Sequence, residues 1–211
     1  MTSSAHLSLS AYKDALKVPH IEEGMSIGLF GGSFNPPHEG HRHVALTALQ
    51  RLQINRLWWL VSPGNPLKQN DGLPPLRERI LHSKQMMVHP RIDVTGCEAT
   101  LKTKYSADLV RHLVKRYPTV RFVWIMGADN LTNFHQWERW QDIAANVPIC
   151  VIDRPGDTLA TRSSQAAKKL LHSRIDAADA KLLKDFSPPA WTFIHAPKNA
   201  LSSTLLRQAK K

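Results

Sequence analysis

Short apolar runs alternate along the chain with stretches in which apolar residues recur at helical spacing. The runs are bounded by glycine, proline or polar residues and are too brief for helices, so each predicts a buried strand. The expected strands cover residues 26–30, 56–62, 92–95, 120–127, 148–152 and 191–194. Helical spacing predicts helices over residues 40–52, 76–87 and 106–114, and a terminal helix capped by Ser202, Ser203 and Thr204. Strands that alternate with helices predict an α/β domain with a mainly parallel sheet.

The length of 211 residues predicts one main domain with a substantial core. Residues 1–25 are rich in serine and weakly patterned, so we expect an N-terminal extension that is loosely structured or forms a short helix. Residues 26–211 then form the single domain, which shows no internal repeat.

The chain carries 28 Lys and Arg against 17 Asp and Glu, a formal net charge of +11. Such a balance favours anionic partners, which are nucleotides, nucleic acid or an acidic membrane surface. The charge is scattered, which argues against a disordered tail that binds nucleic acid. Cys97 and Cys150 lack the spacing of a zinc ribbon or a disulfide framework, and no apolar run is long enough to span a membrane. We therefore expect a cytoplasmic protein in a reducing compartment.

The stretch 31–41, which reads GGSFNPPHEGH, joins the first expected strand to the first expected helix. A strand, a tight turn and a helix start form the geometry in which α/β proteins hold phosphates. Gly31 and Gly32 carry no Cβ, so a polyanion can approach their backbone. His38 and His41 bracket the positive end of the helix, where both rings can face the same anion. The stretch is neither a P-loop nor a dinucleotide-binding fingerprint.

The stretch 31–41 combines the Gly31-Gly32 pair with two prolines and two histidines. It closely resembles the nucleotidyltransferase signature Gly-Gly-Ser-Phe-Asp/Asn-Pro-x-His-x-Gly-His. That superfamily joins a nucleoside monophosphate from ATP or CTP to a phosphorylated acceptor. The resemblance implies a Rossmann-like, doubly wound sheet with strand order 3-2-1-4-5 and helices on both faces. It also implies catalytic roles for His38 and His41, and ATP phosphate binding by Gly31, Gly32, Ser33 and Phe34. A zinc site that includes His43 is disfavoured, because His43 falls on another face of the helix.

Asp129 directly follows the expected strand 120–127, and ligands of doubly wound sheets bind beyond the carboxyl ends of the strands. Two roles suit its carboxylate. It either faces the histidine turn and accepts hydrogen bonds from ribose hydroxyls, or it is the N-cap of the next helix. The spacing of Trp137 and Trp140 suits positions in the core. An indole close to Asp129 is also suited to stack on a flat heteroaromatic ring.

The segment Gly127-Ala128-Asp129-Asn130-Leu131, followed by Phe134 and Trp137, resembles a pattern of bacterial nicotinate-nucleotide adenylyltransferases. The segment Lys104-Tyr105-Ser106-Ala107-Asp108 is similar to their Tyr-Ser/Thr-x-Asp segment. The resemblance implies that Trp137 stacks on the pyridine ring and that Tyr105 and Ser106 help to hold its carboxylate, with Asp129 in the same nucleotide site. From the residues alone, Tyr105 fits a strand end and Ser106 a helix N-cap.

Residues 201–207, LSSTLLR, supply hydroxyls and backbone N–H groups at a helix start, with Arg207 one turn further on. These groups suit a phosphate site as well as a simple helix cap. The stretch resembles the Ile-Ser-Ser-Thr-x-x-Arg motif of the superfamily, which implies that Ser202, Ser203 and Thr204 bind ATP phosphates and that Arg207 is catalytic. Lys68, in the turn-rich loop 63–72, fits a ligand of the triphosphate or a solvated side chain.

The resemblance implies transfer of AMP from ATP to nicotinate mononucleotide, which gives nicotinate adenine dinucleotide and pyrophosphate in NAD biosynthesis. The attacking phosphate is mostly dianionic at pH 7, so no general base is needed, and Mg²⁺ is expected mainly on substrate phosphates. Nicotinamide mononucleotide, phosphopantetheine and FMN stay open as acceptors. A basic module that binds nucleic acid is the alternative from another class. We expect ATP and nicotinate mononucleotide as partners, no nucleic acid and no membrane, and leave a homo-oligomer open.

Overall fold

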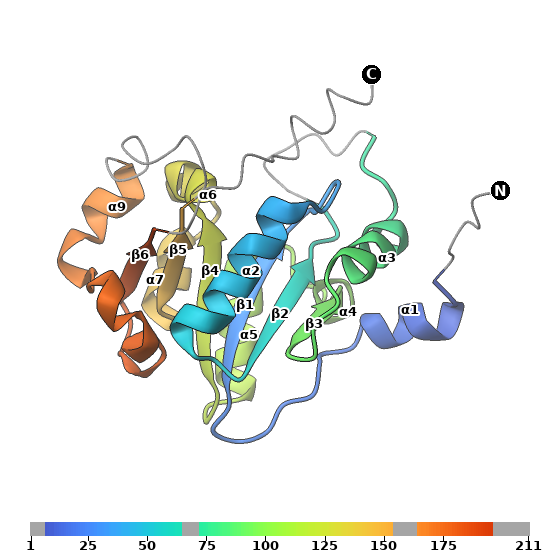
Figure 1. The fold of residues 1–211 in the computed structure, drawn as a ribbon, viewed down its shortest axis with the longest axis horizontal. Coiled ribbons are helices and arrows are strands. Elements are labelled where there is room, and N and C mark those ends of the chain that lie inside the picture. The colour runs from blue at the N-terminus through green and yellow to red at the C-terminus, as the bar shows by residue number, and fades with distance from the viewer. Residues whose placement is uncertain (1–6, 65–71, 154–163, 196–211) are drawn as a thin grey trace.

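The computed structural model describes residues 7–64, 72–153 and 164–195. Within these residues the strands form a single six-stranded sheet in which all neighbouring strands run parallel (Figure 1). The strands are β1 (Ser26–Gly32), β2 (Arg56–Val61), β3 (Ile92–Thr95), β4 (Arg121–Gly127), β5 (Ile149–Ile152) and β6 (Trp191–Ile194). Their order is β3-β2-β1-β4-β5-β6. The predicted order 3-2-1-4-5 is confirmed, and the sixth predicted strand extends the sheet beside β5.

Helices cover both faces of the sheet, as expected for a doubly wound fold (Figure 1). On one face α2 (Glu39–Leu52) contacts η3 (Ala177–Asp185), and on the other α5 (Ser106–Arg116) packs against α7 (Trp140–Asn146). The predicted helices 40–52, 76–87 and 106–114 are present as α2, α3 (Leu76–Met86) and α5. The other described helical segments are α1 (Leu9–Ala15), α4 (Cys97–Leu101), α6 (Ala128–Asn133), η1 (Phe134–Gln136), α9 (Gln165–Lys169) and η2 (Leu171–Ser173). Among the described helices, none is long and apolar enough to cross a membrane.

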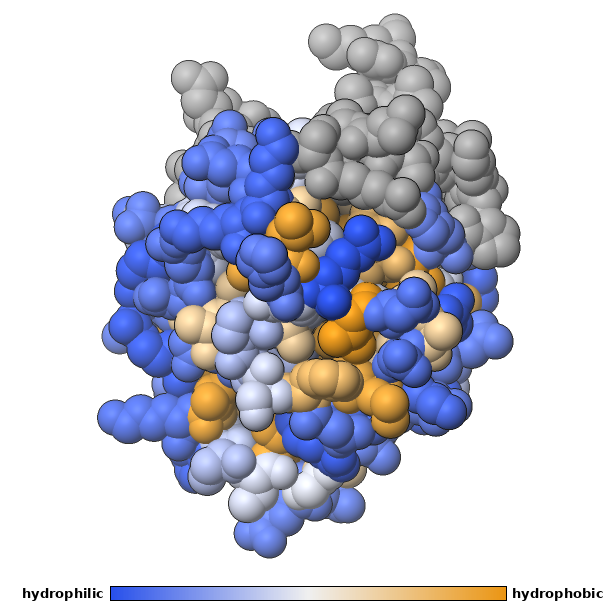
Figure 2. Space-filling model, turned by 90° about the vertical axis from the view of Figure 1, so that its left-hand side faces the viewer, coloured by the Kyte–Doolittle hydropathy of each residue, from blue (hydrophilic) through white to orange (hydrophobic). Residues whose placement is uncertain are grey.

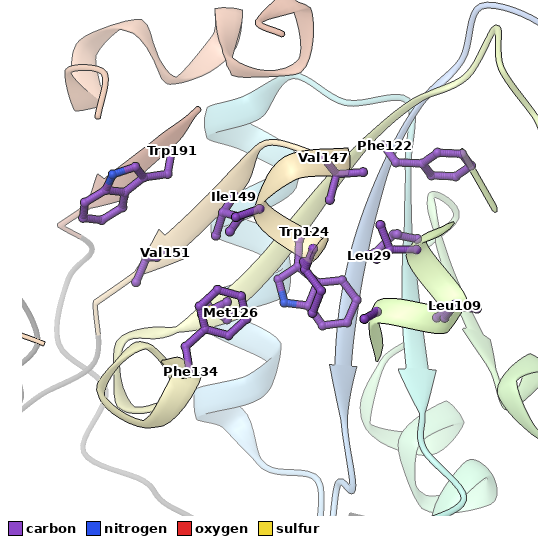
Figure 3. Close-up of a cluster of buried hydrophobic side chains, with 14 of the residues drawn as sticks. Leu29, Leu109, Phe122, Trp124, Met126, Phe134, Val147, Ile149, Val151 and Trp191 are labelled. Carbon is purple, nitrogen blue, oxygen red and sulfur yellow. The ribbon is translucent and has the colours of Figure 1, made fainter. Parts of the chain in front are cut away.

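Two apolar clusters, one on each face of the sheet, hold the layers together. Figure 3 shows the cluster under α5 and α7, with Trp124 of β4 at its centre, Leu29 and Leu109 on one side, and Met126 and Phe134 on the other. Because helices cover both faces, successive strand residues are buried on alternate sides. This two-sided burial explains why the strands read as nearly continuous apolar runs.

The N-terminal residues from Leu7 onward lie against the β3 side of the sheet. Helix α1 ends at Ala15, whose carbonyl accepts a hydrogen bond of 2.8 Å from the Gly96 N–H. The Thr95 hydroxyl lies 3.1 Å from the same carbonyl and 3.0 Å from that of Lys17. The extension therefore contains a short helix that supplies hydrogen bonds to the end of β3. The division into residues 1–25 and 26–211 stays a prediction.

The outer edge of β6 is partly covered by the preceding chain. The Ile175 N–H donates to the Trp191 carbonyl at 2.8 Å, and the Trp191 indole donates to the Leu170 carbonyl at 2.8 Å. Figure 2 views the molecule from the side of β6 and α9, and apolar residues gather near the middle of this face within hydrophilic surroundings. The hydrogen bonds from the chain that precedes β6 protect this edge strand, which would otherwise offer unpaired backbone groups.

Candidate active site

The turn between β1 and α2 lies at the edge of the sheet where the parallel strands end (Figure 1). β1 lies in the middle of the sheet, between β2 and β4, where the strand order reverses. Ligands of doubly wound sheets bind at such a reversal, outside the carboxyl ends of the strands. The fold therefore places the predicted phosphate turn where ligand binding is expected.

The two histidines of the turn lie in contact and cap the start of α2. Their ring centroids are 3.8 Å apart, with planes inclined by 37°. His38 is the N-cap, and its Nδ1 accepts from the Gly40 N–H at 3.1 Å, while His41 Nδ1 accepts from the His38 N–H at 3.3 Å. Because each Nδ1 is an acceptor, these hydrogen bonds assign the proton of both neutral rings to Nε2. Each histidine is thereby fixed as an Nε2–H donor, the form that suits a phosphate oxygen.

Phe34 supports the histidine pair from inside the protein. Its side chain is 2% exposed, and its ring centroid lies 5.0 Å from that of His41 and 4.4 Å from that of Trp59. Its φ angle is +46°, in the left-handed region that residues with a Cβ rarely adopt. The buried ring leaves the backbone N–H as the group through which Phe34 can bind a phosphate.

The glycines of the turn make room for aromatic side chains. A Cβ on Gly31 would lie 3.1 Å from Trp124 Cη2, and a Cβ on Gly32 would lie 3.2 Å from Phe34 Cζ. Sequence reasoning explained these glycines by the close approach of a polyanion. The structure supplies another reason, because a Cβ at either position would crowd the aromatic side chains beneath the turn, which would have to shift by a few tenths of an ångström.

Arg79 of α3 contacts the backbone beside the histidine turn, and the sequence did not single it out. Its side chain is buried, and its guanidinium donates to the carbonyls of Ser33 at 2.8 Å, Ser62 at 2.7 Å, Pro63 at 3.0 Å and Pro74 at 2.9 Å. The available signal was an arginine on the apolar stripe of the predicted helix 76–87. A charged residue on such a stripe indicates a buried polar role.

Tyr105 and Ser106 lie at the start of α5, and one expectation there is wrong. The N-cap is Tyr105, without a side-chain capping bond, and Ser106 is the first residue of the helix. The Ser106 hydroxyl makes no hydrogen bond to the described residues, so it is not the cap that the sequence predicted. It is therefore available to a ligand.

An ion-pair cluster joins the start of α5 to the segment that carries Trp137. The Asp108 carboxylate accepts from Arg139 at 2.7 Å and from Arg111 at 2.8 Å. Burial raises the pKa of Asp108, but the hydrogen bonds and charges of both guanidinium groups outweigh burial and hold this pKa below its usual value. Arg139 also lies 5.8 Å from the centroid of the Tyr105 ring. The cluster keeps Tyr105 and the Trp137 segment in one region.

Trp137 is a partly buried indole that packs against the apolar cluster under α5 and α7. Its ring packs in T-shaped geometry against Trp124, at 6.2 Å, and against Phe134, at 5.4 Å. Asp129 is the second residue of α6, which starts directly after β4, and the N-cap of that helix is Gly127. The cap role that the sequence left open for Asp129 is therefore excluded.

Five predicted site residues, Lys68, Ser202, Ser203, Thr204 and Arg207, lie outside the described residues. Within the described part of the chain, no group of three or more His, Cys, Asp or Glu side chains is arranged to hold a metal ion. Cys97 and Cys150 are buried and are not disulfide-bonded.

A doubly wound parallel sheet with a glycine turn and a helix start at its reversal point is typical of nucleotide-binding α/β proteins. The model of the cytidylyltransferase-like family matches residues 29–209. The chain belongs to this family, and within it to the nicotinate-nucleotide adenylyltransferases, as its relatives show.

A Rhizobium johnstonii protein named "Probable nicotinate-nucleotide adenylyltransferase" is 52% identical over 190 residues, which cover 90% of this chain and 96% of that protein. A Rhizobium meliloti protein of the same name is 54% identical over 186 residues, covering 88% of this chain and 99% of that protein. Among solved structures, Plasmodium falciparum nicotinic acid mononucleotide adenylyltransferase complexed with NaAD matches with a TM-score of 0.67. The match covers 87% of this chain and 83% of that one at 17% identity, and so shows a shared fold.

Proposed function

We propose that this chain transfers AMP from ATP to nicotinate mononucleotide, giving nicotinate adenine dinucleotide and pyrophosphate, a step of NAD biosynthesis. Relatives about half identical over most of the chain carry the name of this activity. The geometric observation that supports the proposal is the histidine pair at the start of α2, which is fixed as two Nε2–H donors.

The reaction is an in-line displacement without a covalent intermediate. A phosphate oxygen of nicotinate mononucleotide attacks the α-phosphorus of ATP, and the bond from this phosphorus to the oxygen that bridges to the β-phosphate breaks. Pyrophosphate leaves with that bridging oxygen. A phosphate monoester is mostly dianionic at pH 7, so the nucleophile needs no general base. The enzyme has to align the two phosphates and stabilise the charge that spreads over the transferred group and the leaving group.

His38 and His41 donate through Nε2–H to the phosphate oxygens of ATP in this proposal. The first N–H groups of α2 and the backbone of Gly31, Gly32 and Phe34 add partial positive charge at the same turn. Ser33 contributes through its backbone. The predicted residues Lys68, Ser202, Ser203, Thr204 and Arg207 complete the phosphate site.

Mg²⁺ is proposed to accompany ATP. Mg²⁺ prefers oxygen ligands in octahedral geometry and is usually bound by substrate phosphates and few protein groups. When bound, the ion neutralises charge on the phosphate oxygens.

The acceptor is proposed to bind between the starts of α5 and α6. Trp137 stacks on the pyridine ring, Tyr105 and Ser106 hold the carboxylate, and Asp129 accepts hydrogen bonds from ribose hydroxyls. The partly buried indole and the Ser106 hydroxyl, which has no hydrogen-bond partner among the described residues, support these roles. A stacked pyridinium would add a cation–π contribution of about 0.5–2 kcal/mol.

The test is pyrophosphate release from ATP, measured with one acceptor at a time: nicotinate mononucleotide, nicotinamide mononucleotide, phosphopantetheine or FMN. We expect the highest kcat/KM with nicotinate mononucleotide. Absence of release with this acceptor, or a higher kcat/KM with another, would overturn the proposal. Filter binding of DNA and RNA across a salt series tests the alternative, because a protein that binds nucleic acid would lose affinity steeply with salt.

We also propose a cytoplasmic location and the division into an N-terminal extension, residues 1–25, and a single domain, residues 26–211. The buried cysteines without a disulfide fit a reducing compartment.

A further inference from the structure

Arg79 ties together three segments at the edge of the sheet where the strands end. Its Nη1 donates to the carbonyls of Ser33, which follows β1, and Ser62, which follows β2. Its Nη2 and Nε donate to the carbonyls of Pro63 and Pro74. A guanidinium presents its N–H groups in a rigid planar fork, so one side chain can hold these carbonyls in a fixed arrangement.

The burial of this guanidinium is unfavourable for the charged group itself. The side chain is 1% exposed, it forms no ion pair with a carboxylate among the described residues, and burial lowers its pKa. Burying a charge without an opposite charge costs free energy, and apolar residues of similar volume often stabilise a core equally well. Stability alone therefore explains this arginine poorly, and its orientation of backbone carbonyls points to a further role.

The bond to Ser33 fixes the orientation of the next amide group. The Ser33–Phe34 peptide is trans, so its N–H points opposite to its C=O. Because the Ser33 carbonyl points at the buried guanidinium of Arg79, the Phe34 N–H points away from it. Phe34 has a φ of +46°, which is unfavourable for a residue with a Cβ. A flip of this peptide plane would return φ to the negative region and reverse the N–H.

We infer that Arg79 is a positioning residue for phosphate binding, which holds the Ser33–Phe34 peptide against this flip and keeps the Phe34 amide directed at a phosphate of ATP. The inference rests on the proposed function, because it requires that the turn binds phosphate. Arg79 acts through the backbone of Ser33 and Phe34 and does not itself touch the substrate.

The test compares Arg79→Met and Arg79→Lys with Arg77→Met. Arg77 is a matched control, because it lies on the same helix and also donates to a backbone carbonyl, that of Leu7, but it is exposed and has no contact with the turn. We expect Arg79→Met to lower kcat/KM for ATP about 10- to 100-fold, as for a misplaced donor. The KM for nicotinate mononucleotide should change far less. Arg79→Lys should keep part of the activity, and Arg77→Met should keep all of it.

Two measurements separate this role from a general loss of structure. Millimolar guanidinium should partly restore the kcat/KM for ATP in Arg79→Met and leave Arg77→Met unaffected. In the full-length protein, inorganic pyrophosphate should shift the Phe34 amide resonance of the wild type strongly and that of Arg79→Met weakly.

The outcomes distinguish failure of the proposed phosphate site from failure of the proposed role of Arg79. If the Phe34 amide of the wild type ignores pyrophosphate, the turn does not bind phosphate there, and the proposed site fails. If pyrophosphate shifts this amide equally in the wild type and in Arg79→Met, or if all kinetic constants fall together in Arg79→Lys, the phosphate site stands and the role of Arg79 is refuted.

Discussion

Replacement of His41 by alanine removes one interaction that the structure shows and one that the proposed function requires. The first is the cap, in which Nδ1 accepts from the His38 N–H at 3.3 Å. Loss of a helix cap costs about 0.5–2 kcal/mol, which lowers the Tm of a chain of this size by about 1–8 °C. The second is the Nε2–H donor at the phosphates, and loss of such a donor raises the barrier by about 2.7–4 kcal/mol. We therefore expect turnover to fall about 10²–10³-fold in a protein that stays folded at 25 °C.

The assay is pyrophosphate release at saturating ATP and nicotinate mononucleotide, with the Tm measured on the same preparation. His41→Asn separates the two interactions, because its amide oxygen can accept from the His38 N–H but its side chain lacks the Nε2–H. This variant should recover part of the Tm while turnover stays low. His43→Ala is the matched control: His43 lies on the same helix, and its buried Nε2 has no hydrogen-bond partner among the described residues.

Near-normal turnover of His41→Ala would refute the reasoning. Recovery of turnover together with Tm in His41→Asn would also refute it, because the histidine would then act only through the cap. A loss in His43→Ala as large as that in His41→Ala would show that the effect comes from the helix as a whole.

Three other predictions concern stability and the acceptor site. Burial raises the pKa of Glu98 to about 7, so the folded state binds a proton that the unfolded state releases, and stability falls as pH rises from about 4.5 to 7. Glu98→Gln should thus stabilise the protein by about 3 kcal/mol at pH 8 and by little at pH 4.5, as measured by thermal unfolding at both pH values. Deletion of residues 1–18 removes the acceptors at the end of β3 and should lower Tm by about 2–8 °C, with kcat nearly unchanged. Arg139→Gln should raise the KM for nicotinate mononucleotide but not for ATP, whereas Arg111→Gln, which removes the other partner of Asp108, should change neither.

The strands were predictable because burial on both faces leaves a clear pattern in the sequence. β4 reads RFVWIMG, with every residue after Arg121 buried, and only a short run of this kind fits a covered parallel strand. The order of the strands was implied by the resemblance of one turn to a superfamily. The contact of α1 with β3 could not be predicted, because it depends on backbone carbonyls, which carry no mark in the sequence.

The histidine turn is contiguous in the sequence, so its residues and its helix start could be identified together. Arg79 lies 46 residues from Ser33 and contacts it through a carbonyl, and Arg139 lies 31 residues from Asp108. The N-cap of α5 was misplaced by one position, on Ser106 in place of Tyr105, because hydroxyl residues near a helix start do not reveal which of them precedes it.

The histidine pair shows how a structural need and a chemical need are met by the same side chains. A serine or aspartate at the N-cap would also accept from the first N–H groups of α2, but its acceptor oxygen would then lie beside the oxygens of a phosphate. An imidazole that accepts through Nδ1 must carry its proton on Nε2, on the other side of the ring, so the cap itself creates the donor. His38 and His41 each accept from a backbone N–H, one from Gly40 and the other from His38, and each therefore carries its proton on Nε2. The start of the helix thus determines the proton position of both rings before any substrate binds, and this preorganisation is what a site without a general base needs.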